Sequence, residues 1–207
     1  MSDHPDLYRP FSADGHTARW QSLRAADTAA DTAVGERDAT ETAEAVDDVT
    51  LSWDNEAWTA SGLVGREQVQ YVLRISPTWQ VRQFLLFRDM DEPDLWVGTD
   101  GGGRWGEMNG AHRPELDGCV DIELACTPFT HTLPVRRLPL HVGHAADIVV
   151  AVVDVETLDI QAAQRRYTRL DTHHWRVEDT ANATVVEFDV DEFGLAGDYS
   201  TLFRRLA

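Results

Sequence analysis

From residue 49 to the C-terminus, short runs of aliphatic, aromatic and β-branched residues are interrupted by Gly, Pro, Asp or Asn at intervals of about ten residues. This spacing is typical of short strands joined by tight turns, and short connections place sequential strands side by side and antiparallel. We therefore expect an all-β, mainly antiparallel single domain in which a meander sheet curls over one core. A two-sheet sandwich is the alternative.

Helix is expected only at 198–206. A short first strand is expected near Trp20, and the other strands are expected at 49–54, 57–65, 68–76, 79–88, 94–98, 103–109, 119–125, 133–141, 146–154, 165–170, 173–178 and 183–190.

Three segments follow from composition. Residues 1–24 are an N-terminal arm that contains the first strand, and residues 49–207 are the main β-domain. Between them, residues 25–48 are small and acidic, with no aromatic residue and two valines. Such a segment buries little apolar surface, so we expect a flexible insertion; a solvated helix is the alternative.

The chain carries a large net negative charge. The 207 residues include 36 Asp and Glu against 18 basic residues, all of which are arginine, for a formal charge of −18. Concentrated salt screens such self-repulsion, which indicates a halophilic source, expected to be archaeal. An ordinary acidic protein from a GC-rich genome is the alternative. Nucleic acids and anionic membrane surfaces are disfavoured as partners, because both require basic clusters.

The N-terminus has neither a basic start nor an apolar run, so we expect a cytoplasmic protein without stable membrane insertion. Two cysteines, Cys119 and Cys126, do not make a disulfide framework, and both are expected to be reduced.

The sharpest local pattern is the segment LDGCVDIEL at 116–124. Alternation along a strand places Cys119, Asp121 and Glu123 on one face and the apolar residues Val120, Ile122 and Leu124 on the other. If the apolar face meets the core, the polar face either is exposed to water or lines a cavity.

Two adjacent arginines, Arg136 and Arg137, follow on the next expected strand, where one of them must point to each face. An inward arginine requires an acidic partner, and Asp121 or Glu123 is the nearest candidate. Such a pair is either purely structural or holds the polar end of a ligand.

Other constellations are weaker. Cys119 with His131 has no recognisable catalytic signature, and neither His141 with His144 nor the adjacent His173 and His174 has zinc-site spacing. The glycine-rich run at 100–105 lacks the Gly-Lys-Ser/Thr ending of a phosphate loop and is interpreted as a hairpin turn. We therefore assign no catalytic residue, metal or cofactor.

Several motifs together resemble a known family. They are WQVRQF (79–84), DGGGRW (100–105), LDGCVDIEL (116–124), TPFTHTLPVRRL (127–138), QRRYTRL (164–170) and VDEFGLAGDYSTLFRRL (190–206). Over roughly residues 50–207 the chain is similar to the family named Putative glycolipid-binding, found in bacteria and archaea.

The resemblance implies a spiral β-roll, a strongly curved sheet around a central cavity, and a glycolipid ligand. It adds Tyr167 and Tyr199 to the candidate site. This chain departs from the family pattern at His131, where asparagine is usual, and at Ser200-Thr201, where Pro-Gly is usual.

We therefore expect a non-enzymatic protein that holds an amphipathic small molecule, such as a glycolipid or isoprenoid-like lipid, inside the curved sheet. The expected ligand-binding residues are Asp121, Glu123, His131, Arg136, Arg137, Tyr167 and Tyr199. An enzyme that uses Asp121 or Glu123 as general acid or base, assisted by His131 or Tyr199, is one alternative, and a structural scaffold is another. The sequence does not define the oligomeric state.

Overall fold

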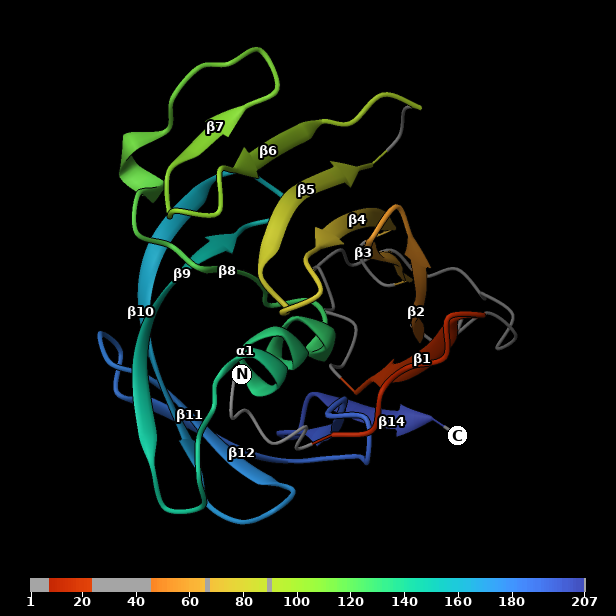
Figure 1. The fold of residues 1–207 in the computed structure, drawn as a ribbon, viewed down its shortest axis with the longest axis vertical. Helices are drawn as coiled ribbons and strands as arrows, with labels where there is room; N and C mark the ends of the chain where they lie inside the picture. Colours follow the sequence, from red (N-terminus) through yellow and green to blue (C-terminus); the bar gives the residue numbers. More distant parts are fainter. Residues whose placement is uncertain (1–7, 24–45, 66–67, 89–90, 207) are drawn as a thin grey trace, which may run out of the picture.

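The structure, a computed structural model, describes residues 8–23, 46–65, 68–88 and 91–206. In these parts of the chain, fourteen strands form one sheet (Figure 1). The strands are β1 (His16–Ser22), β2 (Val46–Asp54), β3 (Ala57–Val64), β4 (Val69–Ile75), β5 (Val81–Phe87), β6 (Leu95–Thr99), β7 (Trp105–Glu107), β8 (Asp121–Leu124), β9 (Ala145–Val153), β10 (Ile160–Arg169), β11 (His174–Asp179), β12 (Thr184–Val190), β13 (Ala196–Tyr199) and β14 (Phe203–Leu206). The helices are η1 (Pro114–Leu116), η2 (Pro128–His131) and α1 (Thr132–Arg137).

The strand order follows the chain in two directions from β1. It runs β7-β6-β5-β4-β3-β2-β1-β14-β13-β12-β11-β10-β9-β8. The chain winds outward from β1 to β7, starts again at the opposite edge with β8, and winds back until β14 pairs with β1. The prediction of an all-β, mainly antiparallel fold is confirmed, and the single sheet replaces the two-sheet alternative.

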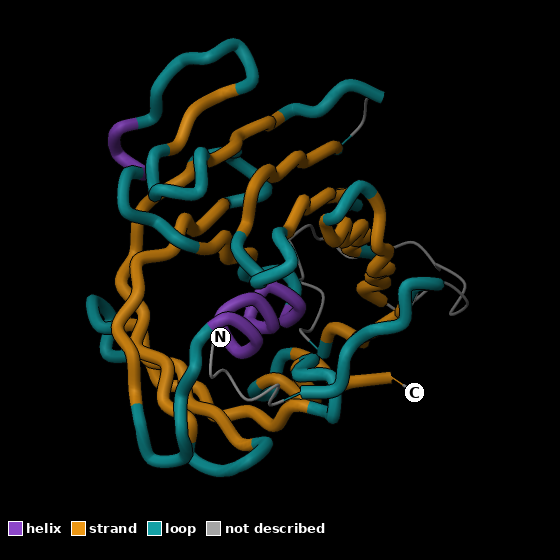
Figure 2. Tube along the Cα trace, viewed as in Figure 1, coloured by secondary structure: helices purple, strands orange, loops and turns teal. Residues whose placement is uncertain are grey.

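One strand pair breaks the antiparallel rule. Strand β8 pairs with β9 in parallel, with Asp121 opposite Val150 and Glu123 opposite Val152. A parallel pair cannot be joined by a tight turn, so the chain must cross over between the two strands. Helices η2 and α1 form this crossover, and they lie inside the curved sheet (Figure 2).

The crossover corrects two expectations. Residues 133–141 are not a strand: Thr127 caps η2 by accepting a hydrogen bond from the Phe129 amide, and Pro128 is in the first helical turn. The expected central space is filled, because residues 128–135 of η2 and α1 are buried. Phe129 and Leu133 belong to the larger hydrophobic core, whereas Val135 belongs to the smaller one, so the crossover joins both cores.

The C-terminal segment 198–206, expected to be helical, instead contributes the end of β13 and all of β14. Its pairing partner is distant in sequence: Phe203 lies opposite Ser22, and Leu206 lies opposite Arg19. Tertiary pairing therefore overrides the local helical preference.

Of the segment 25–48, residues 25–45 lie outside the described residues, and the expectation of a flexible insertion is not addressed for them. Its last three residues are already strand, since β2 begins at Val46, where Val46 and Asp47 pair with Gln21 and Trp20 of β1. No helix in the described ranges combines the length and apolar character needed to span a bilayer.

The two ends of the sheet approach each other at a seam. The indole N–H of Trp105, in edge strand β7, donates to the Cys119 carbonyl just before β8 at 2.9 Å. The Gly118 amide donates to the Gly103 carbonyl at 2.8 Å. The roll is therefore held at its seam by hydrogen bonds that join β7 and the loop before it to the segment that precedes β8, without strand pairing between β7 and β8.

Replacing Trp105 with phenylalanine tests the seam. Trp105 is 1% exposed, and the smaller ring removes the donor while leaving the buried Cys119 carbonyl unpaired. We expect a loss of about 1–3 kcal/mol in the free energy of unfolding. Trp53, which is 37% exposed, provides the control, and Trp53→Phe should change stability by less than about 0.5 kcal/mol. Equal losses in denaturant unfolding of the two variants would contradict the seam's role.

Candidate functional site

The polar face of β8 points into the roll. Asp121 is 1% exposed, and its carboxylate accepts hydrogen bonds from Arg137 of α1, with Nη2···Oδ2 at 2.5 Å and Nε···Oδ1 at 3.4 Å. Burial raises the pKa of Asp121, and the charge and hydrogen bonds of Arg137 oppose that rise. The expectation that an arginine of the Arg136-Arg137 pair meets one of the β8 carboxylates is therefore confirmed for Asp121.

Glu123 has a different partner. Its carboxylate is bound by Arg165 of β10, with Nη2···Oε1 at 2.7 Å and Nε···Oε2 at 2.9 Å. The same guanidinium contacts Asp179 of β11, with Nη1···Oδ2 at 3.1 Å. One arginine thus lies between two carboxylates from two other strands.

Arg136 lies outside this cluster, contrary to its place among the expected ligand-binding residues. Its guanidinium lies over the rings of Phe11 and Trp79, 4.7 and 4.4 Å from their centroids, and donates to the Phe193 carbonyl. Neighbouring residues on a helix point about 100° apart rather than to opposite faces, so the strand-based assignment of the two arginines was wrong in its geometry.

His131, Tyr167 and Tyr199 form a second polar group in the interior. The His131 Nδ1 and the Tyr167 hydroxyl are hydrogen-bonded at 2.7 Å, and the His131 and Tyr199 rings stack with centroids 4.5 Å apart. Burial lowers the pKa of His131 to about 4, opposed by the charge of Glu123 and reinforced by that of Arg165. Burial also raises the pKa of both tyrosines. All three side chains are therefore neutral near pH 7.

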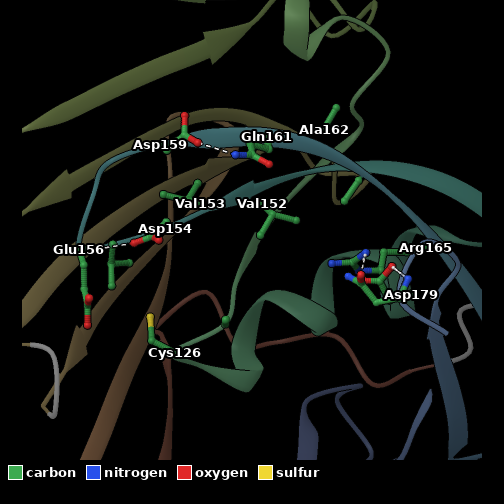
Figure 3. A pocket seen from close by; sticks show the side chains of 14 residues that line it. Cys126, Val152, Val153, Asp154, Glu156, Asp159, Gln161, Ala162, Arg165 and Asp179 are labelled. Atoms are coloured by element: carbon green, nitrogen blue, oxygen red, sulfur yellow. Dashed lines mark hydrogen bonds and ion pairs between the residues drawn. The ribbon is translucent and has the colours of Figure 1, made fainter. Parts of the chain in front are cut away.

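The structure also contains an open groove of about 520 Å³ over β9 and β10, which we call the β9–β10 groove (Figure 3). Arg165 and Asp179 lie at one end, the acidic turn with Asp154 and Glu156 lies toward the other, and Val152 and Val153 lie between them. None of the site residues expected from the sequence lines this groove. They connect to it through the Glu123–Arg165 pair.

Arg165, Asp179 and Gln161 line the groove but are not among the site residues expected from the sequence. The expected strand begins at residue 165, whereas β10 begins at Ile160. Over the full strand, alternation places Gln161 and Arg165 on the same face as Tyr167, which is a signal for these two residues. Asp179 lies on β11, and the alternation in β10 gives no signal for it.

The weaker constellations have structural roles. Burial, with a contribution from Asp117, raises the pKa of the Cys119 thiol to about 11, so this thiol stays protonated. Cys119 lies in the same core as Ile122 and Leu124, and Val120 is exposed, because the strand begins only at Asp121. Neither Cys119 nor Cys126 forms a disulfide bond within the described residues.

The loop at 100–103 joins antiparallel β6 and β7, as predicted, and Asp100 accepts hydrogen bonds from the Gly102 and Arg104 amides. Among the described residues, no three His, Cys, Asp or Glu side chains are grouped as metal ligands would be.

Comparisons with known proteins agree with this fold. The model of the family described as Putative glycolipid-binding matches residues 38–205. The crystal structure of a DUF1089 family protein from Pseudomonas aeruginosa is similar, with a TM-score of 0.68 and 28% identity, over 85% of this chain and 100% of that one. No curated protein matches.

The buried histidine predicts an acid-sensitive fold. The pKa of His131 is about 4 in the folded protein against 6.5 for the ordinary side chain, so the unfolded chain takes up a proton first. Acidification from about pH 7 to about pH 5.5 should therefore remove about 1 kcal/mol of stability through this residue. His131→Gln should lack this contribution in urea unfolding measured across that range.

The exposed His174 is the control, because hydrogen bonding to Asp189 raises its pKa. Its stabilising contribution is complete at acid pH and is lost as pH rises, so His174→Gln should lose more stability on acidification than the wild type does. If His131→Gln keeps the wild-type pH dependence, burial of a neutral imidazole is not the cause.

The Asp121–Arg137 pair predicts strong coupling. Either Asp121→Asn or Arg137→Met leaves a buried charge without its partner and should lower the free energy of unfolding by about 3–5 kcal/mol. In a double-mutant cycle, the double variant should lose at least about 1 kcal/mol less than the sum of the losses of the two single variants. The exposed pair Asp147–Arg166 on β9 and β10, with Nη1···Oδ2 at 2.9 Å, is the matched control. Its coupling in the same cycle should be below about 1 kcal/mol; equal coupling for both pairs would contradict the effect of burial.

Proposed function

Because this chain belongs to the Putative glycolipid-binding family, we propose that it binds an amphipathic small molecule, such as a glycolipid, without chemical conversion, and that the β9–β10 groove holds it. The proposal moves the ligand from the interior of the roll, where η2 and α1 are packed, to an open groove on the sheet. Arg165 links the two, since it contacts Glu123 in the interior and lines the groove.

The observation that carries the proposal is the division of the groove into apolar and polar parts. Val152, Val153, Ala162 and Ala163 provide an apolar floor and wall, while Arg165, Asp179 and Gln161 provide hydrogen-bonding groups beside it. A volume of about 520 Å³ lies within the usual range for small-molecule sites, about 300–1,000 Å³. A ligand with one apolar and one polar part matches this lining on both sides.

The buried polar cluster then acts as support for the groove. Glu123 fixes the guanidinium of Arg165, and the neutral His131, Tyr167 and Tyr199 fill the space behind it. Asp121 and Arg137 bind each other. In this proposal these six residues position the site, and the polar side chains that line the groove, among them Arg165, Asp179 and Gln161, meet the ligand.

The enzyme alternative finds less support. Asp121 is almost completely buried, its two oxygens are bound by Arg137, and neither it nor Glu123 lines the groove. A general acid or base must come within hydrogen-bonding distance of the reacting atom, and a molecule in the groove does not reach Asp121.

A blocking substitution tests the proposal. Ala163 lines the groove, and Ala163→Phe would fill part of it, whereas Gln164 is exposed on the opposite face of β10 and does not line it. With a short-chain monoglucosyl diacylglycerol as the probe, Ala163→Phe should weaken binding at least about tenfold in native mass spectrometry and calorimetry.

Gln164→Phe, the matched control, should bind the probe as the wild type does. Equal binding by the two variants would reject the groove as the ligand site. No binding by the wild type would reject the proposed function itself and favour a scaffold role.

A further inference from the structure

The ionic composition of the β9–β10 groove is unbalanced. Among the described residues that line it, the single guanidinium of Arg165 stands against four carboxylates, those of Asp154, Glu156, Asp159 and Asp179. The imbalance is local to the site and would act on any charged group placed in the groove.

The positive charge of Arg165 is already balanced by two carboxylates of the protein. Two oxygens of Glu123 lie 2.7 and 2.9 Å from its Nη2 and Nε, and Asp179 lies 3.1 Å from its Nη1. An arginine that recognises phosphate or sulfate presents its paired N–H groups to the anion, but here carboxylates of the protein take them. An incoming anion would therefore meet carboxylates without a compensating cation.

Two of these carboxylates, Asp154 and Asp179, are held in the ionised form near neutral pH. Hydrogen bonds from the Thr157 and Glu156 amides lower the pKa of Asp154. Burial opposes ionisation of Asp179, but hydrogen bonds from Asn182 and Ala181 and the charge of Arg165 lower its pKa overall.

The hydrogen-bonding groups suit hydroxyls. The Gln161 side-chain amide donates to Asp159 at 2.6 Å, and the Asn182 side-chain amide donates to Asp179 at 2.9 Å. Each pair leaves carboxylate and amide oxygens as acceptors along the groove. A hydroxyl donates to such acceptors, whereas a phosphate, sulfate or carboxylate group has no proton to donate to them.

We propose that the groove selects an amphipathic ligand whose head is uncharged and rich in hydroxyl groups, and rejects one whose head is anionic. This inference rests on the proposed function, because it assumes that the groove is the ligand site. The specificity-determining residues are Asp179 and Asp159, with Glu123 withholding Arg165 from anions.

The test compares two short-chain lipids with the same acyl chains, a monoglucosyl diacylglycerol and phosphatidic acid. Wild-type protein, at a salt concentration that keeps it folded, should bind the anionic lipid at least about tenfold more weakly, which corresponds to about 1.4 kcal/mol. Binding of both lipids with equal affinity would overturn the selectivity while leaving the proposed function intact. Binding of neither would overturn the proposed function itself.

Two variants identify the residues responsible. Asp179→Asn keeps the shape of the side chain, removes one charge and frees part of Arg165, so it should strengthen binding of phosphatidic acid several-fold with little change for the glucosyl lipid. Asp159→Asn, at an exposed position, should shift selectivity in the same direction and serves if Asp179→Asn does not fold.

Asp147→Asn is the matched control. Asp147 pairs with Arg166 on the same two strands but does not line the groove, and both side chains are exposed. It removes the same charge from the whole protein, so an equal gain in phosphatidic acid binding by Asp147→Asn would show that total charge, rather than the groove, sets the selectivity. Selectivity unchanged in all three variants would overturn the inference.

Discussion

Two carboxylates that point into the roll determine much of what surrounds them. Asp121 and Glu123 lie on the inner face of β8. Removing a charge from water costs roughly several kcal/mol per ion unless a partner of opposite charge compensates it. Each has a guanidinium from a different element: Arg137 from α1 and Arg165 from β10. These pairs tie the edge strand to the crossover helix on one side and to the long hairpin of β9 and β10 on the other. The groove lies beside the second pair, and its polar end exists because Glu123 holds Arg165 in place.

Ionic groups in this protein therefore fall into two classes. Most of the acidic residues in the described parts of the chain are exposed, and pairs such as Asp147–Arg166 contribute little to stability because water and salt screen them. The small buried set has the opposite character, since low exposure strengthens both the attraction within a pair and the penalty for breaking it. Even the shift in the pKa of His131 comes first from burial rather than from the surface charge.

Sequence patterns predicted the strands well where local rules apply. Turn residues at regular spacing located the hairpins from β2 to β7 and from β9 to β12, and alternation correctly placed Asp121 and Glu123 on the same face of β8, although it left open whether that face meets water or the interior. The failures share a cause. Residues 133–141 and 198–206 were assigned from local propensity, but the first is a buried crossover and the second pairs with β1, some 180 residues earlier in the chain. The Thr127-Pro128 helix start was present in the sequence and indicated the first of these.

By itself, the sequence determined the all-β class, the positions of most strands, the shared face of the two β8 carboxylates and the family to which the motifs belong. Only the tertiary structure decided which arginine meets which carboxylate, that Arg136 packs on aromatic rings instead, that the centre is filled by η2 and α1, and that an open groove lies over β9 and β10. The physical reason is the parallel pairing of β8 with β9. That pairing forces the intervening chain to cross over through the interior, so a helix fills the space that a simple meander would have left open.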